Sequence, residues 1–208
     1  MQANSHITNI IDGISKERLE KYLIASSGDN AKALSLYELN TRVSEAFYTP
    51  IQGFEILLRN SIHKSLSKDY GVDWLTSGKI SLEFFQRDAI LKTLDKSKIV
   101  LTIPKMIAEL NLGFWTSLFS RKYEELWRHN LRHVFKQTPT PLRRKEILKQ
   151  LNTIRELRNR IAHHEPIFHR ELYEEHQSII NIIGLICPYT QEWIIKESRF
   201  NDVYQSTS

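Results

Sequence analysis

The apolar residues of this 208-residue chain recur every three or four positions almost everywhere between its seven glycines and six prolines. The segment 51–70, for example, places Phe54, Leu58 and Ile62 on one side of a helix. No stretch alternates apolar and polar residues for long enough to build a sheet, although 98–103 is compatible with an extended segment. The sequence therefore predicts an all-α fold, a single-domain helical bundle of about seven to nine helices over residues 1–208.

Capping residues indicate several helix ends. Ser15 is expected to cap a helix that reaches about residue 23. Thr140 followed by Pro141 is typical of a helix start, and Pro166 is expected to end that same helix. The polar segment 199–208 is expected to be a frayed tail.

The composition indicates which cellular compartment and which kind of partner suit such a chain. The formal net charge is +5, which favours a polyanionic partner. The single cysteine excludes an internal disulfide and fits a reducing compartment. The N-terminal residues lack the pattern of a secretory leader, and the longest apolar runs fall well short of the roughly 20 residues that span a bilayer. We therefore expect a cytoplasmic protein without a membrane partner.

The stretch 151–170, LNTIRELRNRIAHHEPIFHR, holds most of the residues that suggest a chemical function. On a helical wheel, Arg158 falls inside the apolar arc, whereas Glu156 and Arg160 project to the opposite, solvated side. The wheel therefore separates Arg158 from ordinary surface charges. The apolar arc itself consists of Leu151, Ile154, Leu157 and Ile161.

Arg158 needs a partner, because an arginine against a core cannot readily lose its charge. One interpretation is a structural ion pair with Glu55, although Glu55 can instead pair with Arg59 one helical turn away. The other interpretation is a phosphate site that combines Arg158 with Asn159 and His163. Arginine binds phosphate oxygens through two nitrogens, asparagine orients or donates, and histidine transfers protons near neutral pH.

Glu55 and Arg59 belong to this candidate site in a supporting role, and so do Arg155 and His164. Arg155 shares a flank of the expected helix with His163. His164 projects in another direction on the wheel, so we rank it as secondary or structural. The three histidines 163, 164 and 169 do not predict a metal site, because Pro166 interrupts the helix and no HExxH pattern is present.

Basic and aromatic residues alternate in the central segment 115–136. Lysines and arginines beside Trp115 and Tyr123 suit contacts with an RNA backbone and stacking on bases. The same aromatic residues have helical spacing and can equally belong to the core. For Trp127 and Phe135 we favour the core.

The motif LRNRIAHHEPIF resembles the Abi-like (abortive infection) proteins, a branch of the HEPN superfamily. That superfamily has an arginine, usually followed by a polar residue, and a histidine a few positions later; here these are Arg158, Asn159 and His163. The segments GFEILLRNSI, LNLGFWTSLFSRKYEELW and LRRKEILKQLNTIRELRNRIAHHEPIFHREL extend the resemblance over roughly residues 35–175. His169 is a departure, since many relatives have asparagine there.

The resemblance implies a HEPN-like fold and a metal-independent endoribonuclease without a cofactor, acting in abortive-infection phage defence or as a toxin. In such an enzyme the ribose 2′-OH of RNA is the nucleophile. His163 would move the proton, Arg158 would hold the phosphate and Asn159 would orient the site. The implied partners are RNA (tRNA, mRNA or rRNA), a second copy of the chain in a homodimer with a composite active site, and an antitoxin. The alternative is a non-catalytic HEPN-type helical module that binds RNA or protein.

Overall fold

A computed structural model describes residues 2–96, 102–137 and 142–205, and all regular structure among them is helical. The prediction of an all-α fold is confirmed. The α-helices are α1 (Gln2–Ile14), α2 (Lys16–Ala25), α3 (Asn30–Ala46), α4 (Tyr48–Tyr70), α5 (Phe84–Lys96), α6 (Ile103–Glu109), α7 (Leu112–Ser117), α8 (Glu124–His129), α9 (Arg144–Ala162), α10 (Leu172–Ile186), α11 (Pro188–Glu197) and α12 (Phe200–Gln205). Two 3₁₀ helices, η1 (Arg121–Tyr123) and η2 (Leu131–Val134), flank α8. The described residues hold more helices than expected, because the middle of the chain is divided into pieces of six or seven residues.

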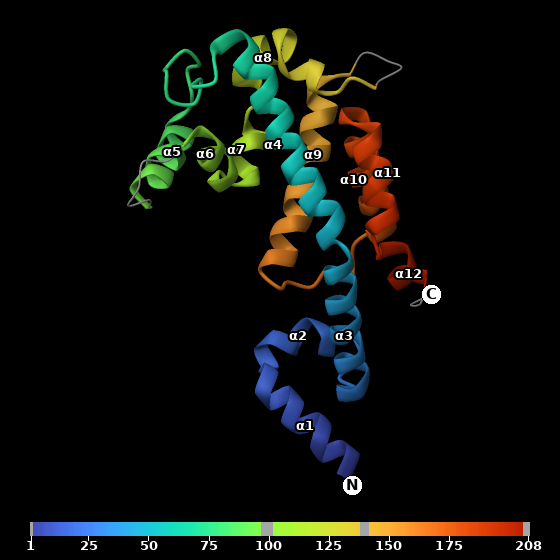
Figure 1. The fold of residues 1–208 in the computed structure, drawn as a ribbon. Coiled ribbons are helices and arrows are strands. Elements are labelled where there is room, and N and C mark those ends of the chain that lie inside the picture. Colours follow the sequence, from blue (N-terminus) through green and yellow to red (C-terminus); the bar gives the residue numbers. More distant parts are fainter. Residues whose placement is uncertain (1, 97–101, 138–141, 206–208) are drawn as a thin grey trace.

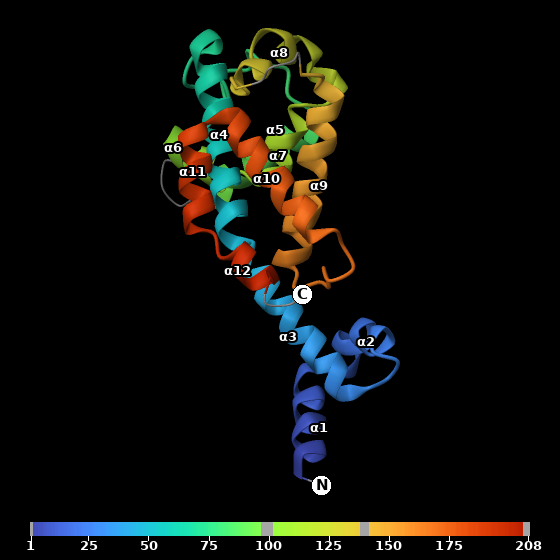
Figure 2. The same ribbon diagram turned by 90° about the vertical axis from the view of Figure 1, so that its right-hand side faces the viewer.

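Helix α4 lies at the centre of the main bundle (Figures 1 and 2). Helix α10 packs along α4 and α11, and α7 and η2 also contact α4. Helix α9 packs against α7 and α10. Four side chains of α4, each one turn from the next, are fully buried, which explains the helical repeat of this segment. They are Phe54, Leu58, Ile62 and Leu66.

A second hydrophobic cluster holds the N-terminal end of the molecule together. Helices α1 and α2 pack on the first half of α3 and form an arm that projects away from the main bundle (Figures 1 and 2). The centre of this cluster consists of Ile11, Leu19, Tyr22 and Ala33. Phe168, from the segment after α9, also packs on the cluster. The arm therefore meets the rest of the chain beside the segment that follows α9.

Several expected helix ends can now be compared with the structure. Ser15 does cap α2, since its side chain accepts a hydrogen bond from the backbone N–H of Arg18. Residues 97–101 and 138–141 lie outside the described residues, and so do most of the 98–103 segment and the Thr140–Pro141 pair. The first helical residue after this second gap is Arg144.

The prediction of a frayed tail from residue 199 is wrong for residues 200–205. They form α12, because Phe200 is completely buried and packs against the ring of Phe47.

Among the described residues, no helix is both long enough and apolar enough to cross a bilayer.

Candidate functional site

Arg158 of α9 and Glu55 of α4 form an ion pair, with 2.7 Å between the arginine Nε and the carboxylate Oε1. The side chains are 36% and 25% exposed, so the pair lies at the edge of the bundle rather than in its core. The ion pair with Glu55, which the sequence left as one of two interpretations, is present, and Glu55 makes no ion pair with Arg59 within the described residues. Within the described residues, Nε is the only nitrogen of the Arg158 side chain with a hydrogen-bond partner, and the two terminal guanidinium nitrogens can bind a phosphate.

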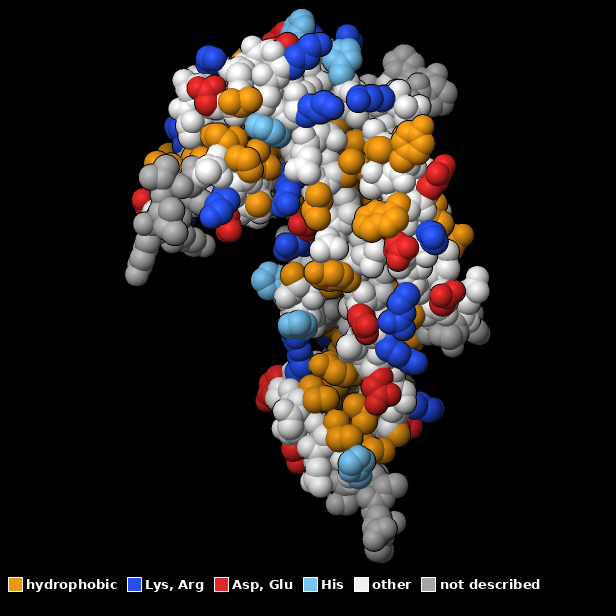
Figure 3. All heavy atoms as spheres, in the orientation of Figure 1, with side chains coloured by type: hydrophobic (Ala, Val, Ile, Leu, Met, Phe, Trp, Pro, Cys, Tyr) orange, Lys and Arg blue, Asp and Glu red, His pale blue; other side chains and the backbone are white. Residues whose placement is uncertain are grey.

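The other two arginines of the candidate site connect the same helices to α6 and α7. Nη1 of Arg59 donates a hydrogen bond to the carbonyl oxygen of Ala108, at 3.2 Å. Nη1 of Arg155 lies 3.5 Å from Oγ1 of Thr116. Figure 3 shows a hollow in the molecular surface below the α5–α6 side of the molecule, with basic, acidic and histidine side chains along its wall. The candidate site thus lies where α4 and α9 meet the short central helices.

Helix α9 ends at Ala162, four residues before Pro166, so the prediction that this proline ends the helix is wrong. The helix ends in a Schellman motif, which needs one residue with left-handed backbone geometry. His164 supplies it, with φ of 55°. The two closing hydrogen bonds run from the N–H of His164 to the oxygen of Ile161 (3.0 Å) and from the N–H of Glu165 to the oxygen of Arg160 (2.7 Å).

His163 is the cap residue of α9, and its backbone is held on both sides. Its N–H donates to the oxygen of Asn159 at 2.9 Å, and its carbonyl oxygen accepts from Nη2 of Arg18 in α2 at 3.3 Å. Both Asn159 and His163 are exposed, and within the described residues neither side chain has a hydrogen-bond partner. The backbone stays near-helical at His163, so its side chain leaves the helix about 140° around the axis from Arg158. The arginine and the histidine of one chain therefore diverge.

The prediction that Arg160 is an ordinary solvated residue is wrong. Its side chain is 27% exposed and lies 3.5 Å from Glu156 and 3.4 Å from Glu165. Arg170 contacts the same Glu156 at 2.9 Å, and it also binds Glu175 at 2.6 Å. The hydrogen bond from Arg170 lowers the pKa of the Glu156 carboxyl, which keeps it charged. These contacts fix the segment after α9 to the end of the helix.

Among the described parts of the chain, no three His, Cys, Asp or Glu side chains are grouped to hold a metal ion. Burial, followed by the nearby guanidinium of Arg160, lowers the pKa of His169, which favours its neutral form.

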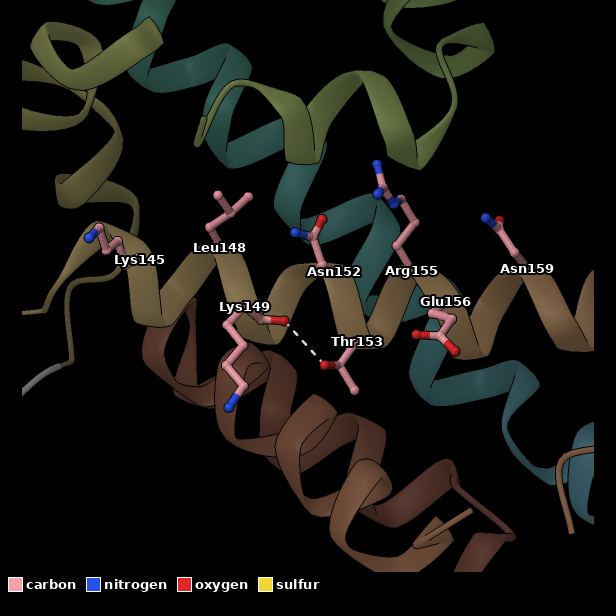
Figure 4. A pocket seen from close by; sticks show the side chains of 8 residues that line it. All are labelled: Lys145, Leu148, Lys149, Asn152, Thr153, Arg155, Glu156 and Asn159. Atoms are coloured by element: carbon pink, nitrogen blue, oxygen red, sulfur yellow. Dashed lines mark hydrogen bonds between the residues drawn. The ribbon is translucent and has the colours of Figure 1, made fainter. Parts of the chain in front are cut away.

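One flank of α9 is hollowed into an open groove of about 630 Å³. Figure 4 shows Leu148, Asn152, Arg155 and Asn159 projecting in a row from the same side of the helix. The groove therefore ends at a candidate catalytic residue, one turn before His163. The lining residues in the described part of the chain all belong to α9: Lys145, Leu148, Lys149, Asn152, Thr153, Arg155, Glu156 and Asn159.

The aromatic residues of the basic central segment are all buried. Trp115 and Tyr123 are 1% and 4% exposed, and Trp127 and Phe135 are 6% and 2% exposed. The prediction that Trp127 and Phe135 belong to the core is confirmed. The interpretation of Trp115 and Tyr123 as stacking platforms for RNA bases is wrong, because a buried ring cannot meet a base.

Comparisons of the chain with protein-family models, curated proteins and solved structures find no match. The chemical roles of Arg158, Asn159 and His163 stay predictions. Two residues that the sequence pattern missed, Arg18 and Arg170, contact this region from outside α9.

Proposed function

We propose that this chain is a metal-independent endoribonuclease of the HEPN type that acts in abortive-infection phage defence or as a toxin. The observation that carries the proposal is the ion pair between Arg158 and Glu55. The carboxylate holds the arginine by Nε alone and leaves two nitrogens for a phosphate at a half-exposed position. Asn159 is the next residue, and the exposed His163 lies one turn further along.

The reaction needs only groups that RNA and this site provide. The ribose 2′-OH attacks the adjacent phosphorus, the P–O5′ bond breaks, and the products are a 2′,3′-cyclic phosphate and a 5′-hydroxyl end. His163 takes the proton from the 2′-OH or delivers one to the leaving oxygen. Arg158 neutralises the charge that develops on the phosphate oxygens, and Asn159 orients them. Glu55 acts as a positioning residue through Arg158.

The test is cleavage of tRNA and mRNA by the purified protein in the presence of a chelator. Replacing His163 by alanine is expected to lower the cleavage rate about 10²- to 10⁴-fold, the usual contribution of a proton-transfer group. Sequencing the new RNA ends should find 2′,3′-cyclic phosphates. Equal background cleavage by the wild type and the His163→Ala variant would refute the enzyme.

A second copy of the chain is part of the proposal, because Arg158 and His163 diverge on one helix. We propose a composite site in a homodimer, with the arginine of one protomer facing the histidine of its partner. Mixing the inactive Arg158→Ala and His163→Ala variants would then rebuild one intact site in each mixed dimer and restore about a quarter of the wild-type activity. A strictly monomeric protein in light scattering, or no activity in the mixture, contradicts this arrangement.

The second candidate function is a non-catalytic helical module that binds RNA or protein. The same ion pair favours it, since an arginine already paired with a carboxylate can have a purely structural role. In that case Arg158→Ala should destabilise the fold and His163→Ala should leave every phenotype intact. If the protein is a ribonuclease, both variants should lose toxicity, and His163→Ala should keep the wild-type melting temperature.

A further inference from the structure

We infer that the groove on α9 is the track along which a single RNA strand reaches the candidate active site. This inference rests on the proposed function. It adds the residues that bind the RNA at positions distant from the phosphodiester bond that is cleaved. The track is defined by Lys145, Lys149, Asn152, Arg155 and Asn159, which line the groove and follow one another every three or four residues along α9. In Figure 4, Asn152, Arg155 and Asn159 project from one side of the helix, and Lys149 points the other way.

The length of the track suits a short strand of nucleic acid. From Lys145 to Asn159 the helix rises about 21 Å, at about 1.5 Å per residue. At roughly 3.4 Å per stacked nucleotide, this is the length of about six nucleotides. Hydrogen-bond donors that all lie on one helix can follow the backbone of a single RNA strand. The two strands of a duplex lie on either side of a groove, so one helix would not contact both in this way.

The charges of the track favour a phosphate backbone. Lys145 and Lys149 are exposed, and within the described residues neither side chain makes an ion pair or a hydrogen bond. Among the described residues, the side chain of Arg155 makes one hydrogen bond, to the hydroxyl group of Thr116, and no ion pair. The one acidic lining residue, Glu156, is compensated by Arg170 at 2.9 Å and by Arg160 at 3.5 Å. Within the described part of the chain, the groove therefore has three cations without a carboxylate partner, and its acidic residue Glu156 has two basic partners.

The neutral residues of the track fit the rest of a strand. The amide groups of Asn152 and Asn159 can donate and accept hydrogen bonds to phosphates, 2′-hydroxyls or base edges. Leu148 adds an apolar surface for a ribose. No aromatic ring is among the described residues that line the groove, so the strand is held mainly by its backbone and with little preference for base sequence.

The experiment measures binding without cleavage. The probe is a fluorescent 2′-O-methyl oligouridylate of about twelve nucleotides, which lacks the attacking hydroxyl, and its anisotropy is followed with the full chain at several salt concentrations. The double variant Lys145→Ala/Lys149→Ala is expected to bind about tenfold more weakly, and the slope of log K against log salt should fall by about 1.4, or about 0.7 per lost phosphate contact. The matched control is Lys64→Ala/Lys68→Ala, which removes two exposed lysines at the same spacing from α4 and should bind within about twofold of wild type.

The possible results distinguish the proposed RNA track from the proposed ribonuclease activity. Unchanged binding by the Lys145/Lys149 double variant, or an equal loss in the control, overturns the track while His163-dependent cleavage still stands. Track-dependent binding without any RNA cleavage supports the track and refutes the enzyme. If polyglutamate displaces the probe as well as unlabelled RNA does, the groove recognises acidic protein and the assignment to RNA is overturned.

Discussion

The two ends of helix α9 each carry an arginine–glutamate ion pair, but the surroundings of the pairs differ. Near the start, Arg144 places Nε 2.6 Å from Glu124 and Nη1 2.7 Å from the carbonyl oxygen of Phe119, and its side chain is 8% exposed. Near the end, the pair of Arg158 with Glu55 is about as short, yet the arginine is 36% exposed and uses one nitrogen. Burial and the number of occupied donors, rather than the distance, therefore distinguish a structural arginine from one that can meet a ligand.

Acid should produce the largest effect, and it tests the core that supports both ends of α9. His176 is 3% exposed, stacks on Phe200 at 4.1 Å, and has no hydrogen-bond partner for either ring nitrogen within the described residues. Burial lowers its pKa to about 4, against about 6.5 in an unfolded chain. Because the unfolded chain binds the proton more tightly, stability should fall as the pH drops from about 6.5, by about 3 kcal/mol at pH 4.

Urea unfolding between pH 7 and pH 4 measures this loss. The His176→Leu variant keeps the volume of the site approximately and cannot titrate, so its stability should depend much less on pH. Equal losses in the variant and the wild type would show that other groups cause the acid sensitivity.

The next largest effect is expected at the start of α9. Replacing Arg144 by alanine leaves Glu124 with only its longer 3.7 Å contact to Arg128, and it leaves the carbonyl oxygen of Phe119 without the Arg144 donor. The unfolding free energy should fall by about 2 kcal/mol, less than for a fully buried pair because Glu124 is 38% exposed. The neighbouring Arg143→Ala is the control, since that side chain is 83% exposed and should matter little. Similar losses of unfolding free energy in both variants would show that the ion pair of Arg144 is no more important for stability than an exposed arginine.

At the other end, Arg158→Ala should cost at most about 1 kcal/mol of stability, because the pair is partly solvated. RNA cleavage should nevertheless be lost, since the phosphate ligand is gone. The comparison is measured by chemical unfolding and by cleavage of the same RNA. A stability loss as large as that of Arg144→Ala would make this pair structural too.

The smallest effect on stability is expected for Arg18→Ala, because a single exposed hydrogen bond to the carbonyl oxygen of His163 contributes only about 0.5 to 1 kcal/mol. Cleavage should fall severalfold if the arm formed by α1 and α2 keeps the end of α9 in place. Lys16→Ala, at an exposed position of the same helix, is the control. Identical cleavage by both variants would leave the arm without a role in positioning His163.

The sequence predicted those features that follow from the regular geometry of one helix. Leu151, Ile154 and Leu157 are buried as the wheel requires. The sequence offered the pairing of Glu55 with Arg158, 103 positions apart, as one of two interpretations, because a charge close to a core needs an opposite charge on a neighbouring helix.

The features that escaped prediction depend on irregular segments. The contacts of Arg170 with Glu156 and of Arg18 with His163 require the path of the segment after α9 and the placement of the N-terminal arm, and neither has a periodic pattern. The tail was predicted as frayed because its polar residues concealed one anchor, Phe200. The end of α9 was placed too late because proline is a conspicuous signal, whereas a left-handed histidine is not.

That left-handed backbone has a consequence for the histidine doublet 163–164. At position 164 a glycine has no steric penalty and an asparagine has a small one, whereas valine, isoleucine and threonine are strongly disfavoured. In a library of all single substitutions, the residues tolerated at 164 should be ranked by backbone freedom. Those tolerated at 163 should instead be ranked by their ability to carry a proton. If the proposed function holds, the two neighbouring histidines therefore differ in what limits substitution: backbone geometry at position 164 and proton transfer at position 163.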